Sequence, residues 1–264
     1  MGITIESTQN KYFKKYKGLN LKKNRELDGL YLLEGLRYID TAITMGHPFE
    51  AILVDINYWE SIANQEYYKN VCEVMVLSGQ LMKDISQTEH SQGIIGVMRN
   101  QPLPDLKSHL EREDSKNILF LDRLQDPGNL GTIIRTADAA GFDTIICTKG
   151  TVDAFNPKVV RSTAGSILNV LVYYVEDSME SLTMIKEKGY KCVVTALDNA
   201  VDYHLPDIYG AKNCLVIGNE ANGVSAQVLD LADVTVKIPI LGGAESLNAS
   251  VAAGIMMYQI ISKH

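Results

Sequence analysis

Several signatures of metal-binding, membrane and nucleotide-binding proteins are missing from this 264-residue chain. Its four cysteines and five histidines are widely spaced, with neither a CxxC pair nor a spacing typical of metal ligands. No apolar run is long enough to span a membrane, and neither GxGxxG nor a Walker A loop is present. Cys147, Cys192 and Cys214 lie in apolar runs. We therefore expect no metal, no membrane segment, and buried free thiols in a reducing cytoplasm.

Positive charge is scarce overall but concentrated at the start of the chain. The net charge of −7 argues mildly against a nucleic-acid partner. Residues 1–30, however, carry seven lysines and arginines against three acidic residues. A phosphate-binding protein needs a local cationic patch rather than a basic total. The lysine-rich first helix is therefore either an RNA-contacting surface or an ordinary solvated face.

The first hundred residues alternate between short apolar runs and helical patterns. This alternation predicts a small α/β domain. A charged stretch with two prolines, residues 101–116, is the candidate linker, and we place the domains at 1–104 and 105–264. The expected strands lie at 30–33, 51–54, 74–77 and 93–98, and the expected helices at 10–27, 36–45 and 57–70, with another starting near 78.

The second part of the chain has a more regular pattern. Its apolar strands have no polar face, which predicts a parallel sheet covered by helices. In such sheets ligands bind beyond the carboxyl ends of the strands. The expected strands lie at 118–121, 144–148, 170–174, 192–197, 214–217 and 234–238, and the expected helices at 130–140, 157–165, 178–188 and from 248. Polar and glycine-rich breaks follow four of these strands, at 122–131, 197–199, 218–223 and 239–248.

The first of these breaks, DRLQDPGNLGTIIRTADAAGF, contains two candidate functional residues. Asn129 is a plausible N-cap of the following helix. Arg135 follows among apolar residues, and burying a guanidinium without a partner is costly. It could pair with Asp122 or Asp126 and staple the turn, or it could bind a phosphate through two hydrogen bonds.

The other two motifs are LVIGNEANGVS and IPILGGAESLNASVAA. In the first, Gly218 and Gly223 allow a close backbone approach, and Glu220 could cap a helix that begins near Ser225. In the second, Ser246 and Asn248 are both good N-cap residues, and a glycine loop before a helix leaves N–H groups for a polar ligand. Each motif alone is also compatible with an ordinary strand–loop–helix unit.

Taken together and in this order, NLGTIIR, GNEANG and IPILGGAESLNASVA resemble the three motifs of the SpoU (TrmH-like) family of RNA ribose 2′-O-methyltransferases, in the SPOUT class. The resemblance covers residues 117–263. In the first domain, YLLEGLRYIDTAI and ISQTEHSQGIIGVM resemble the RNA substrate-binding domain, related to a ribosomal-protein fold, that precedes the catalytic domain in this family.

The resemblance implies an α/β fold whose parallel sheet ends in a C-terminal trefoil knot, and a homodimer whose active sites borrow from the partner. It implies S-adenosylmethionine as the cofactor and RNA as the substrate, with ribosomal RNA favoured over transfer RNA. The catalytic residues it implies are Asn129, Arg135, Glu220, Ser246 and Asn248. The cofactor-binding residues it implies are Thr195, Ala196, Leu197, Gly218, Asn219, Glu220, Ile238, Ile240, Leu247 and Asn248.

The roles of these residues follow from their chemistry. A base role has been suggested for the family position of Arg135, but a guanidinium, with a pKa of roughly 12 or more, rarely gives up its proton. We interpret Arg135 as the group that holds the phosphate beside the target ribose. Glu220 and Asn129 are interpreted as orienting polar groups, including each other. The alternatives are a transfer-RNA methyltransferase, a non-catalytic RNA- or ribosome-binding protein of the same fold, and a Rossmann-type nucleotide enzyme, which the missing glycine fingerprint disfavours.

Overall fold

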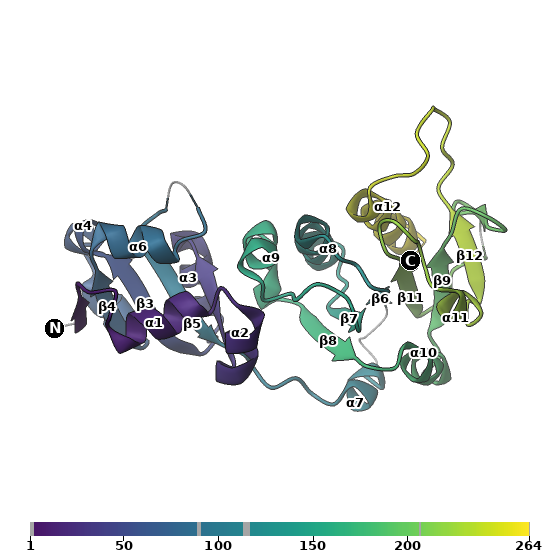
Figure 1. Cartoon of the computed structure of the whole chain (residues 1–264). Coiled ribbons are helices and arrows are strands. Elements are labelled where there is room, and N and C mark those ends of the chain that lie inside the picture. Colours follow the sequence, from purple (N-terminus) through teal and green to yellow (C-terminus); the bar gives the residue numbers. More distant parts are fainter. Residues whose placement is uncertain (1–2, 89–90, 113–116, 206, 264) are drawn as a thin grey trace. The chain divides into compact units, whose positions relative to one another are not determined.

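The computed structural model describes residues 3–88, 91–112, 117–205 and 207–263. The chain forms two compact units (Figure 1). The first comprises Met1–Pro102 together with Phe155–Leu168, and the second comprises Leu103–Ala154 together with Asn169–His264. The first unit therefore contains a segment that lies, in the sequence, between the two parts of the second unit. Within the described residues no helix is long and apolar enough to cross a membrane.

The first unit is built on a five-stranded mixed sheet. Strands β1, β4 and β3 are parallel, and β5 runs antiparallel to both β3 and β2. The strand order is β1 (Ile3–Ile5), β4 (Glu73–Leu77), β3 (Phe49–Asp55), β5 (Ile94–Arg99), β2 (Leu30–Glu34). The helices between the strands are α3 (Leu36–Thr44), α4 (Ile56–Ser61), α5 (Gln65–Lys69) and α6 (Gly79–Ile85). The α/β character expected for this part is confirmed, and the short β1 was missed.

The expected single helix at 10–27 is wrong, because two helices occupy this stretch. α1 spans Lys11–Gly18 and α2 spans Lys22–Asp28. Leu21, between them, has an extended backbone. Phe13 and Tyr16 are buried as the apolar pattern predicts, but Leu27 is 79% exposed. The expected helix at 57–70 likewise divides, into α4 and α5.

Helix α9 (Pro157–Ser162) and the short 3-10 helix η1 (Ser166–Leu168) pack within the first unit. The Phe155 ring lies 4.8 Å from that of Tyr31, centroid to centroid. The Arg161 guanidinium donates to the carbonyl of Gln87 at 2.7 Å. The expected helix at 157–165 therefore ends early, and its residues belong to the core of the other unit.

The second unit contains a seven-stranded sheet in which every pairing is parallel, as the apolar strands predict. The strand order is β10 (Val201–Asp202), β12 (Val234–Lys237), β9 (Lys191–Thr195), β11 (Asn213–Ile217), β6 (Asn117–Leu121), β7 (Thr144–Thr148), β8 (Leu171–Val175). Its helices are α7 (Leu106–Leu110), α8 (Pro127–Ala139), α10 (Ser178–Glu187), α11 (Ala226–Leu229) and α12 (Ala249–Ile261). β10 and α7 were not anticipated from the sequence, whereas α11 begins where a helix near Ser225 was expected.

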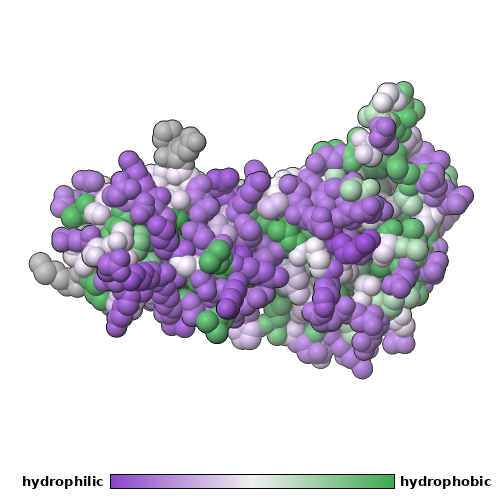
Figure 2. Space-filling view, in the orientation of Figure 1, coloured by the Kyte–Doolittle hydropathy of each residue, from purple (hydrophilic) through white to green (hydrophobic). Residues whose placement is uncertain are grey.

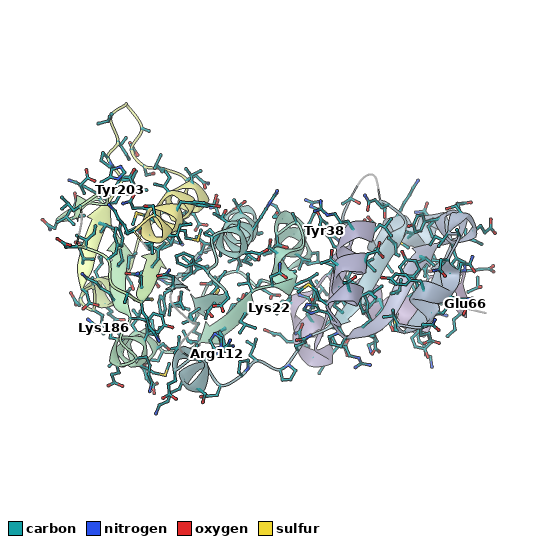
Figure 3. The ribbon with its side chains drawn as sticks, turned by 180° about the vertical axis from the view of Figure 1, so that it is seen from behind. Lys22, Tyr38, Glu66, Arg112, Lys186 and Tyr203 are labelled. Carbon is teal, nitrogen blue, oxygen red and sulfur yellow. The ribbon has the colours of Figure 1, made fainter. Side chains whose placement is uncertain are left out.

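The amino-terminal edge of this sheet is held by a carboxylate that precedes β12. Asp233 accepts a hydrogen bond from the backbone N–H of Cys192 at 2.7 Å. It also forms an ion pair at 2.9 Å with Lys186 of α10. Lys186 is labelled in Figure 3. Cys192 and Cys214 are buried as free thiols on neighbouring strands, as expected from the apolar runs that contain them.

The N-caps of the helices in this unit differ from the expectation at α8 and agree with it at α12. Helix α8 is capped by Asp126, whose carboxylate accepts from the backbone N–H of Asn129, so the assignment of Asn129 as N-cap is wrong. A proline at the first helical position is the usual companion of such a cap. Helix α10 is capped by Asp177. Helix α12 is capped by Asn248, which confirms one of its two proposed caps.

Candidate functional site

Three loops meet at the carboxyl-terminal edge of the parallel sheet. They follow β6, β11 and β12, and they carry the three sequence motifs. The carboxylate of Glu220, after β11, accepts the backbone N–H groups of two residues that follow β6. Oε2 accepts from Gln125 at 3.1 Å, and Oε1 accepts from Asp126 at 2.9 Å. Glu220 therefore joins two loops that lie more than 90 residues apart in the sequence, and the idea that it caps α11 is wrong.

Asn129 extends this contact into helix α8. Its side-chain Nδ2 donates to Oε1 of Glu220 at 3.1 Å. Its Oδ1 therefore faces away from the carboxylate, where it accepts from Nδ2 of Asn248 at 2.8 Å. The carboxylate sets the direction of the Asn129 amide, because only the NH2 side can donate to it. The expectation that Glu220 and Asn129 orient each other is supported by this geometry.

Asn248 completes the network from the third loop. Its Oδ1 accepts from the backbone N–H groups of Ser250 at 2.9 Å and Val251 at 3.3 Å. It also accepts from the Ser250 hydroxyl at 2.6 Å. Asn248 is thus both the N-cap of α12 and the donor to Asn129. Asn248 is exposed, and only one of the two N–H groups on its Nδ2 is used within the described part of the chain, so the other is left to meet a ligand.

These hydrogen bonds set the protonation state of Glu220. Partial burial raises the pKa of its carboxyl, but the bonds from Asn129 and from the amides of Asp126 and Gln125 lower it more, so the pKa lies below its usual value. A general base needs an oxygen free to take a proton at neutral pH. Glu220 is ionised and surrounded by donors, so it acts as an orienting anion rather than as a base.

Only glycine fits at position 218, because the backbone of the same loop lies against it. A Cβ at this position would lie 2.3 Å from the carbonyl carbon of Gly223 and from the backbone nitrogen of Val224. Asn219 and Gly223 exchange two backbone hydrogen bonds, at 3.0 and 2.9 Å. Gly223 has a φ of +64°, a conformation that favours glycine. The close approach predicted from these glycines is therefore made by the loop's own backbone, which folds back on itself.

Arg135 and Ser246 are not brought into this network. Arg135 is exposed on α8 and makes no hydrogen bond or ion pair with any residue that the structure describes, so the proposed staple to Asp122 or Asp126 is absent. Ser246 is exposed in the loop before α12 and has no hydrogen bond to a described residue. Both side chains face solvent on this chain.

The residues implied as cofactor ligands fall into two groups. Gly218 and Asn219 are buried in the second loop. Of the others, four are half-buried, Thr195, Ala196, Ile238 and Ile240, and four are exposed, Leu197, Glu220, Leu247 and Asn248. The loop between β12 and α12 projects from the second unit (Figure 1), and its apolar tip is visible in Figure 2. Leu241 in this loop is 98% exposed.

Three residues shape the same loops. Asp122 and Arg123 were missed as functional candidates, whereas Asn219 was expected only as a cofactor ligand. Asp122 is buried and accepts from the backbone N–H of Ser225 at 2.7 Å. Arg123 has a left-handed backbone, with a φ of +59°. Asn219 donates from Nδ2 to the carbonyl of Arg123 at 2.8 Å. No spacing in the sequence marks them as a set, because Asn219 lies 96 residues from its partner.

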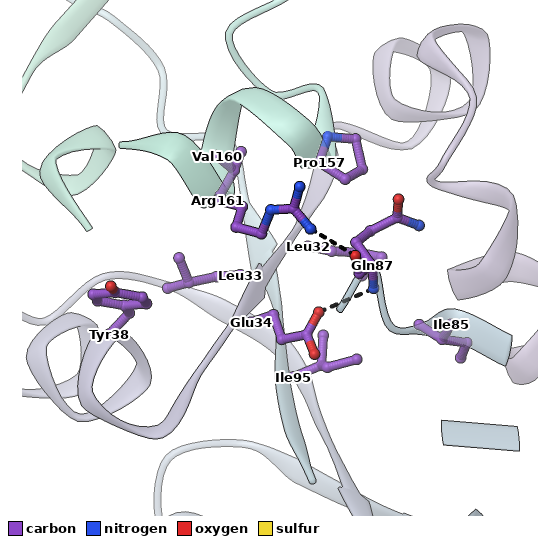
Figure 4. Close-up of a pocket in the computed structure, with 10 residues that line it drawn as sticks. All are labelled: Leu32, Leu33, Glu34, Tyr38, Ile85, Gln87, Ile95, Pro157, Val160 and Arg161. Carbon is purple, nitrogen blue, oxygen red and sulfur yellow. Dashed lines mark hydrogen bonds between the residues drawn. The ribbon is translucent and has the colours of Figure 1, made fainter. Parts of the chain in front are cut away.

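A cavity in the first unit offers a different location for a site. It measures about 370 Å³ with its open mouth, and Glu34 and Arg161 are its charged lining residues (Figure 4). Both side chains form hydrogen bonds with the segment after α6. Glu34 accepts from the hydroxyl of Ser86 at 2.6 Å and of Thr88 at 2.7 Å, and Arg161 donates to Gln87. These contacts hold a loop in place and leave no reactive group in the cavity.

The described histidines, cysteines and carboxylates form no group of three or more that could hold a metal ion. His90 and His264 lie outside the described residues.

Comparison with known proteins identifies the family that this geometry serves. Residues 116–258, more than half of the chain, match the SpoU rRNA Methylase family. Residues 10–96 match the MRM3-like substrate binding domain. The chain belongs to the SpoU rRNA methylase family. The three loops joined by Glu220, Asn129 and Asn248 all lie within the SpoU match.

Relatives of this SpoU protein span nearly its whole length. It is 35% identical over 97% of its length to the 23S rRNA (guanosine(2553)-2'-O)-methyltransferase RlmP of Bacillus subtilis, of which it covers 98%. An AdoMet-bound rRNA methyltransferase from Sinorhizobium meliloti has a TM-score of 0.86 at 29% identity, covering 97% of this chain and 96% of that one. The AdoMet complex of the SpoU methyltransferase AviRb from Streptomyces viridochromogenes has a TM-score of 0.85 at 29% identity, covering 97% and 98%. The α/β fold with its parallel sheet is thereby confirmed.

Proposed function

We propose that this SpoU protein transfers a methyl group from S-adenosylmethionine (AdoMet) to a ribose 2′-hydroxyl of ribosomal RNA. The observation that carries the proposal is the network of Glu220, Asn129 and Asn248, which joins the three family motifs at the carboxyl ends of the parallel strands. The named rRNA methyltransferases that the chain resembles, two of them with AdoMet bound, support the cofactor and the substrate class.

The loop before α12 fits a cofactor that is gripped by main-chain groups and apolar contacts. Residues 240–247 make no backbone–backbone hydrogen bond with the described part of the chain, so their N–H and C=O groups are free to bind an adenine edge. Half-buried Ile238 and Ile240 and exposed Leu197 and Leu247 provide apolar surface for a flat ring. We assign AdoMet to this loop, with Thr195, Ala196, Gly218, Asn219 and Glu220 at its border.

When bound, AdoMet supplies an activated methyl group on a sulfonium sulfur. The residues of this chain then have to align a ribose oxygen with that methyl and favour the loss of its proton. Asn248 offers a remaining N–H to a substrate oxygen, and Ser246 offers a hydroxyl beside it. Arg135 binds the phosphate next to the target ribose and stabilises the developing alkoxide by its charge. Glu220 keeps the two asparagine amides in the direction that this arrangement needs.

A homodimer would bring Arg135 to the reaction. The side chain points to solvent on α8, which packs against α12. Val251 and Tyr258 of α12 are each 50% exposed, so the α8–α12 surface has apolar groups to bury against a second copy. We propose that Arg135 of one protomer serves the AdoMet loop of its partner. We also propose the C-terminal trefoil knot, supported by the return of α12 to α8 and by the bond between Asn248 and Asn129.

We assign RNA binding to the first domain, residues 1–104, and methyl transfer to residues 105–264. The match of residues 10–96 to a substrate-binding domain supports this division. Because the substrate is ribosomal RNA, we place the protein in the cytoplasm. A transfer-RNA target and a non-catalytic ribosome-binding role are the alternative outcomes of the test.

The test has two arms. Calorimetric titration of the purified protein with AdoMet is expected to show one binding event for each site. Mapping of 2′-O-methyl groups in total RNA, with and without the gene, is expected to show one ribosomal nucleotide whose methylation depends on the protein. Absence of AdoMet binding would overturn the enzymatic proposal. A dependent site in transfer RNA would overturn the substrate.

A further inference from the structure

The loop that carries Glu220 is held by a buried carboxylate outside the network of Glu220, Asn129 and Asn248. Asp122 is the first residue after β6 and is 2% exposed. Its Oδ2 accepts from the backbone N–H of Ser225 at 2.7 Å, which is the far end of the Glu220 loop. Its Oδ1 accepts from Nε of Arg123 at 3.1 Å. A buried charge is tolerated only with such partners, so Asp122 ties the end of β6 to the Glu220 loop.

Arg123, the next residue, determines the backbone conformation of the turn after β6. Its φ of +59° is uncommon for a residue other than glycine and strains the backbone. Three contacts hold it there. Its N–H donates to the hydroxyl of Thr148 at 3.0 Å, its carbonyl accepts from Asn219 at 2.8 Å, and its guanidinium binds Asp122. The chain leaves this turn with the N–H groups of Gln125 and Asp126 directed at Glu220.

Asn219 acts from the other side of the same contact. Its Nδ2 donates to the carbonyl of Arg123, and its Oδ1 accepts from the N–H groups of Ala221 and Asn222, both at 3.0 Å. Both the nitrogen and the oxygen of its side-chain amide therefore help to shape the tight turn that contains Glu220. Both halves of the Glu220 contact, the carboxylate and the amides that hold it, are positioned by these bonds.

We propose that Asp122, Arg123 and Asn219 are positioning residues for methyl transfer. They act through Glu220, by fixing its carboxylate against the amides of Gln125 and Asp126, and they touch neither the RNA nor the methyl group. The inference rests on the proposed function and deepens it. We call the bonded set of Asp122, Arg123, Asn219 and Thr148 the Asp122 clamp.

A double-mutant cycle tests whether the clamp works through Glu220. Asp122→Asn is expected to lower kcat/KM for methyl transfer at least ten-fold, at a temperature where the variant is fully folded. In a Glu220→Gln background the same substitution is expected to lower it less than about three-fold, because the carboxylate that it positions is already gone. Equal losses in the two backgrounds would overturn the proposal, and so would a lower melting temperature with unchanged kcat/KM.

Asp233→Asn is the matched control. Asp233 also accepts a backbone N–H at 2.7 Å, but it lies at the amino-terminal edge of the same sheet. This variant is expected to melt earlier and to keep its kcat/KM. If Asp122→Asn does not fold, Thr148→Val removes the acceptor for the Arg123 N–H with little change of shape, and it is expected to lower kcat/KM in the same direction with the same dependence on Glu220.

Hydrogen exchange provides a readout that does not depend on activity. Asp122→Asn is expected to speed the exchange of the amides of Gln125 and Asp126, whereas Asp233→Asn leaves them protected. Unchanged exchange in Asp122→Asn would overturn the clamp even in an active enzyme. A wild-type protein that neither binds AdoMet nor transfers a methyl group, but shows this exchange pattern, would instead refute the proposed function and leave the clamp standing.

Discussion

Nδ2 of Asn248 donates to Oδ1 of Asn129 at 2.8 Å, across 119 residues of the chain. Glu220 sets the direction of this bond. Asn129 must turn its NH2 group toward the Glu220 carboxylate, which leaves its Oδ1 to accept from Asn248. The loop that follows β12 is therefore anchored to helix α8 by an oriented side-chain amide.

Glu220→Gln is expected to disturb this orientation. A glutamine amide would place a donor among the three donors that now meet the carboxylate, the N–H groups of Gln125 and Asp126 and Nδ2 of Asn129. Loss of a hydrogen bond to a charged group costs roughly 1.5–3 kcal/mol. We expect kcat/KM to fall about 10- to 100-fold, measured by transfer of a labelled methyl group to ribosomal RNA. Glu187→Gln, exposed on α10 and away from the three loops, should have little effect.

The same carboxylate predicts a dependence of stability on pH. Because the pKa of Glu220 is lowered by folding, its contribution to stability is full above its ordinary value of 4.5 and is lost as the pH falls through the lower folded pKa. The difference in unfolding free energy between wild type and Glu220→Gln should therefore be largest at neutral pH and shrink below pH 4.5. Urea denaturation at pH 7 and pH 4 measures it, and a gap that widened in acid would contradict this account.

Gly218→Ala should displace the Glu220 loop. The added methyl group would meet the backbone of Gly223 and Val224 at 2.3 Å, where nothing flexible can give way. Overpacking of this kind costs about 1–3 kcal/mol. We expect a lower melting temperature together with weaker AdoMet binding by calorimetry.

Arg135→Ala is expected to reduce turnover roughly 10²-fold, the effect of removing one donor to a developing anion, while the melting temperature stays the same because the side chain is exposed. Arg135→Lys keeps the charge but not the two-pronged geometry, and should recover little activity.

If Arg135 works in the partner's site, a mixture of Arg135→Ala and Glu220→Gln chains should regain part of the activity that neither has alone. A mixture as inactive as its components would argue for a site within one chain.

The lysines of the first unit predict how RNA binding responds to salt. Lys15, Lys17 and Lys22 each pair with a carboxylate, whereas Lys11, Lys14 and Lys23 form no ion pair within the described residues. The second group is therefore available to phosphates. Affinity for RNA should fall steeply as the salt concentration is raised. The double variant Lys14→Gln/Lys23→Gln should reduce the slope of log affinity against log salt concentration by roughly one unit for each phosphate that it no longer binds. A slope unchanged by both substitutions would reassign the RNA-binding face.

The parallel sheet could be predicted from sequence because its strands are short, apolar on both faces and separated by helical patterns. The same local rules misplaced the start of a helix where two nearby polar residues could each serve as its N-cap. In Asp126–Pro127–Gly128–Asn129 both ends can cap a helix, and the proline at the first helical position favours Asp126, which is the cap observed. The packing of α9 within the first unit has no local signal, since it depends on contacts such as Phe155 with Tyr31.

For the site, the motifs named Asn129, Glu220 and Asn248 without indicating how they are joined. Hydrogen-bond direction depends on which loops meet in space, and bonds such as that of Glu220 to the amide of Asp126 link residues far apart in sequence. Asp122 and Arg123 stand directly before the first motif's turn, yet a buried carboxylate and a left-handed arginine look like ordinary polar residues until the strands are assembled.

The segment between β12 and α12 starts from a strand paired on both sides and ends at the residue that caps α12. Folding of the sheet and of α12 therefore already fixes its end-to-end distance. The entropic cost of closing the loop is part of folding and does not weaken ligand binding. A methyl donor has only to order the intervening residues, not to bring the two ends together. Lengthening this segment should weaken cofactor affinity through entropy alone, with every side chain of the network left in place.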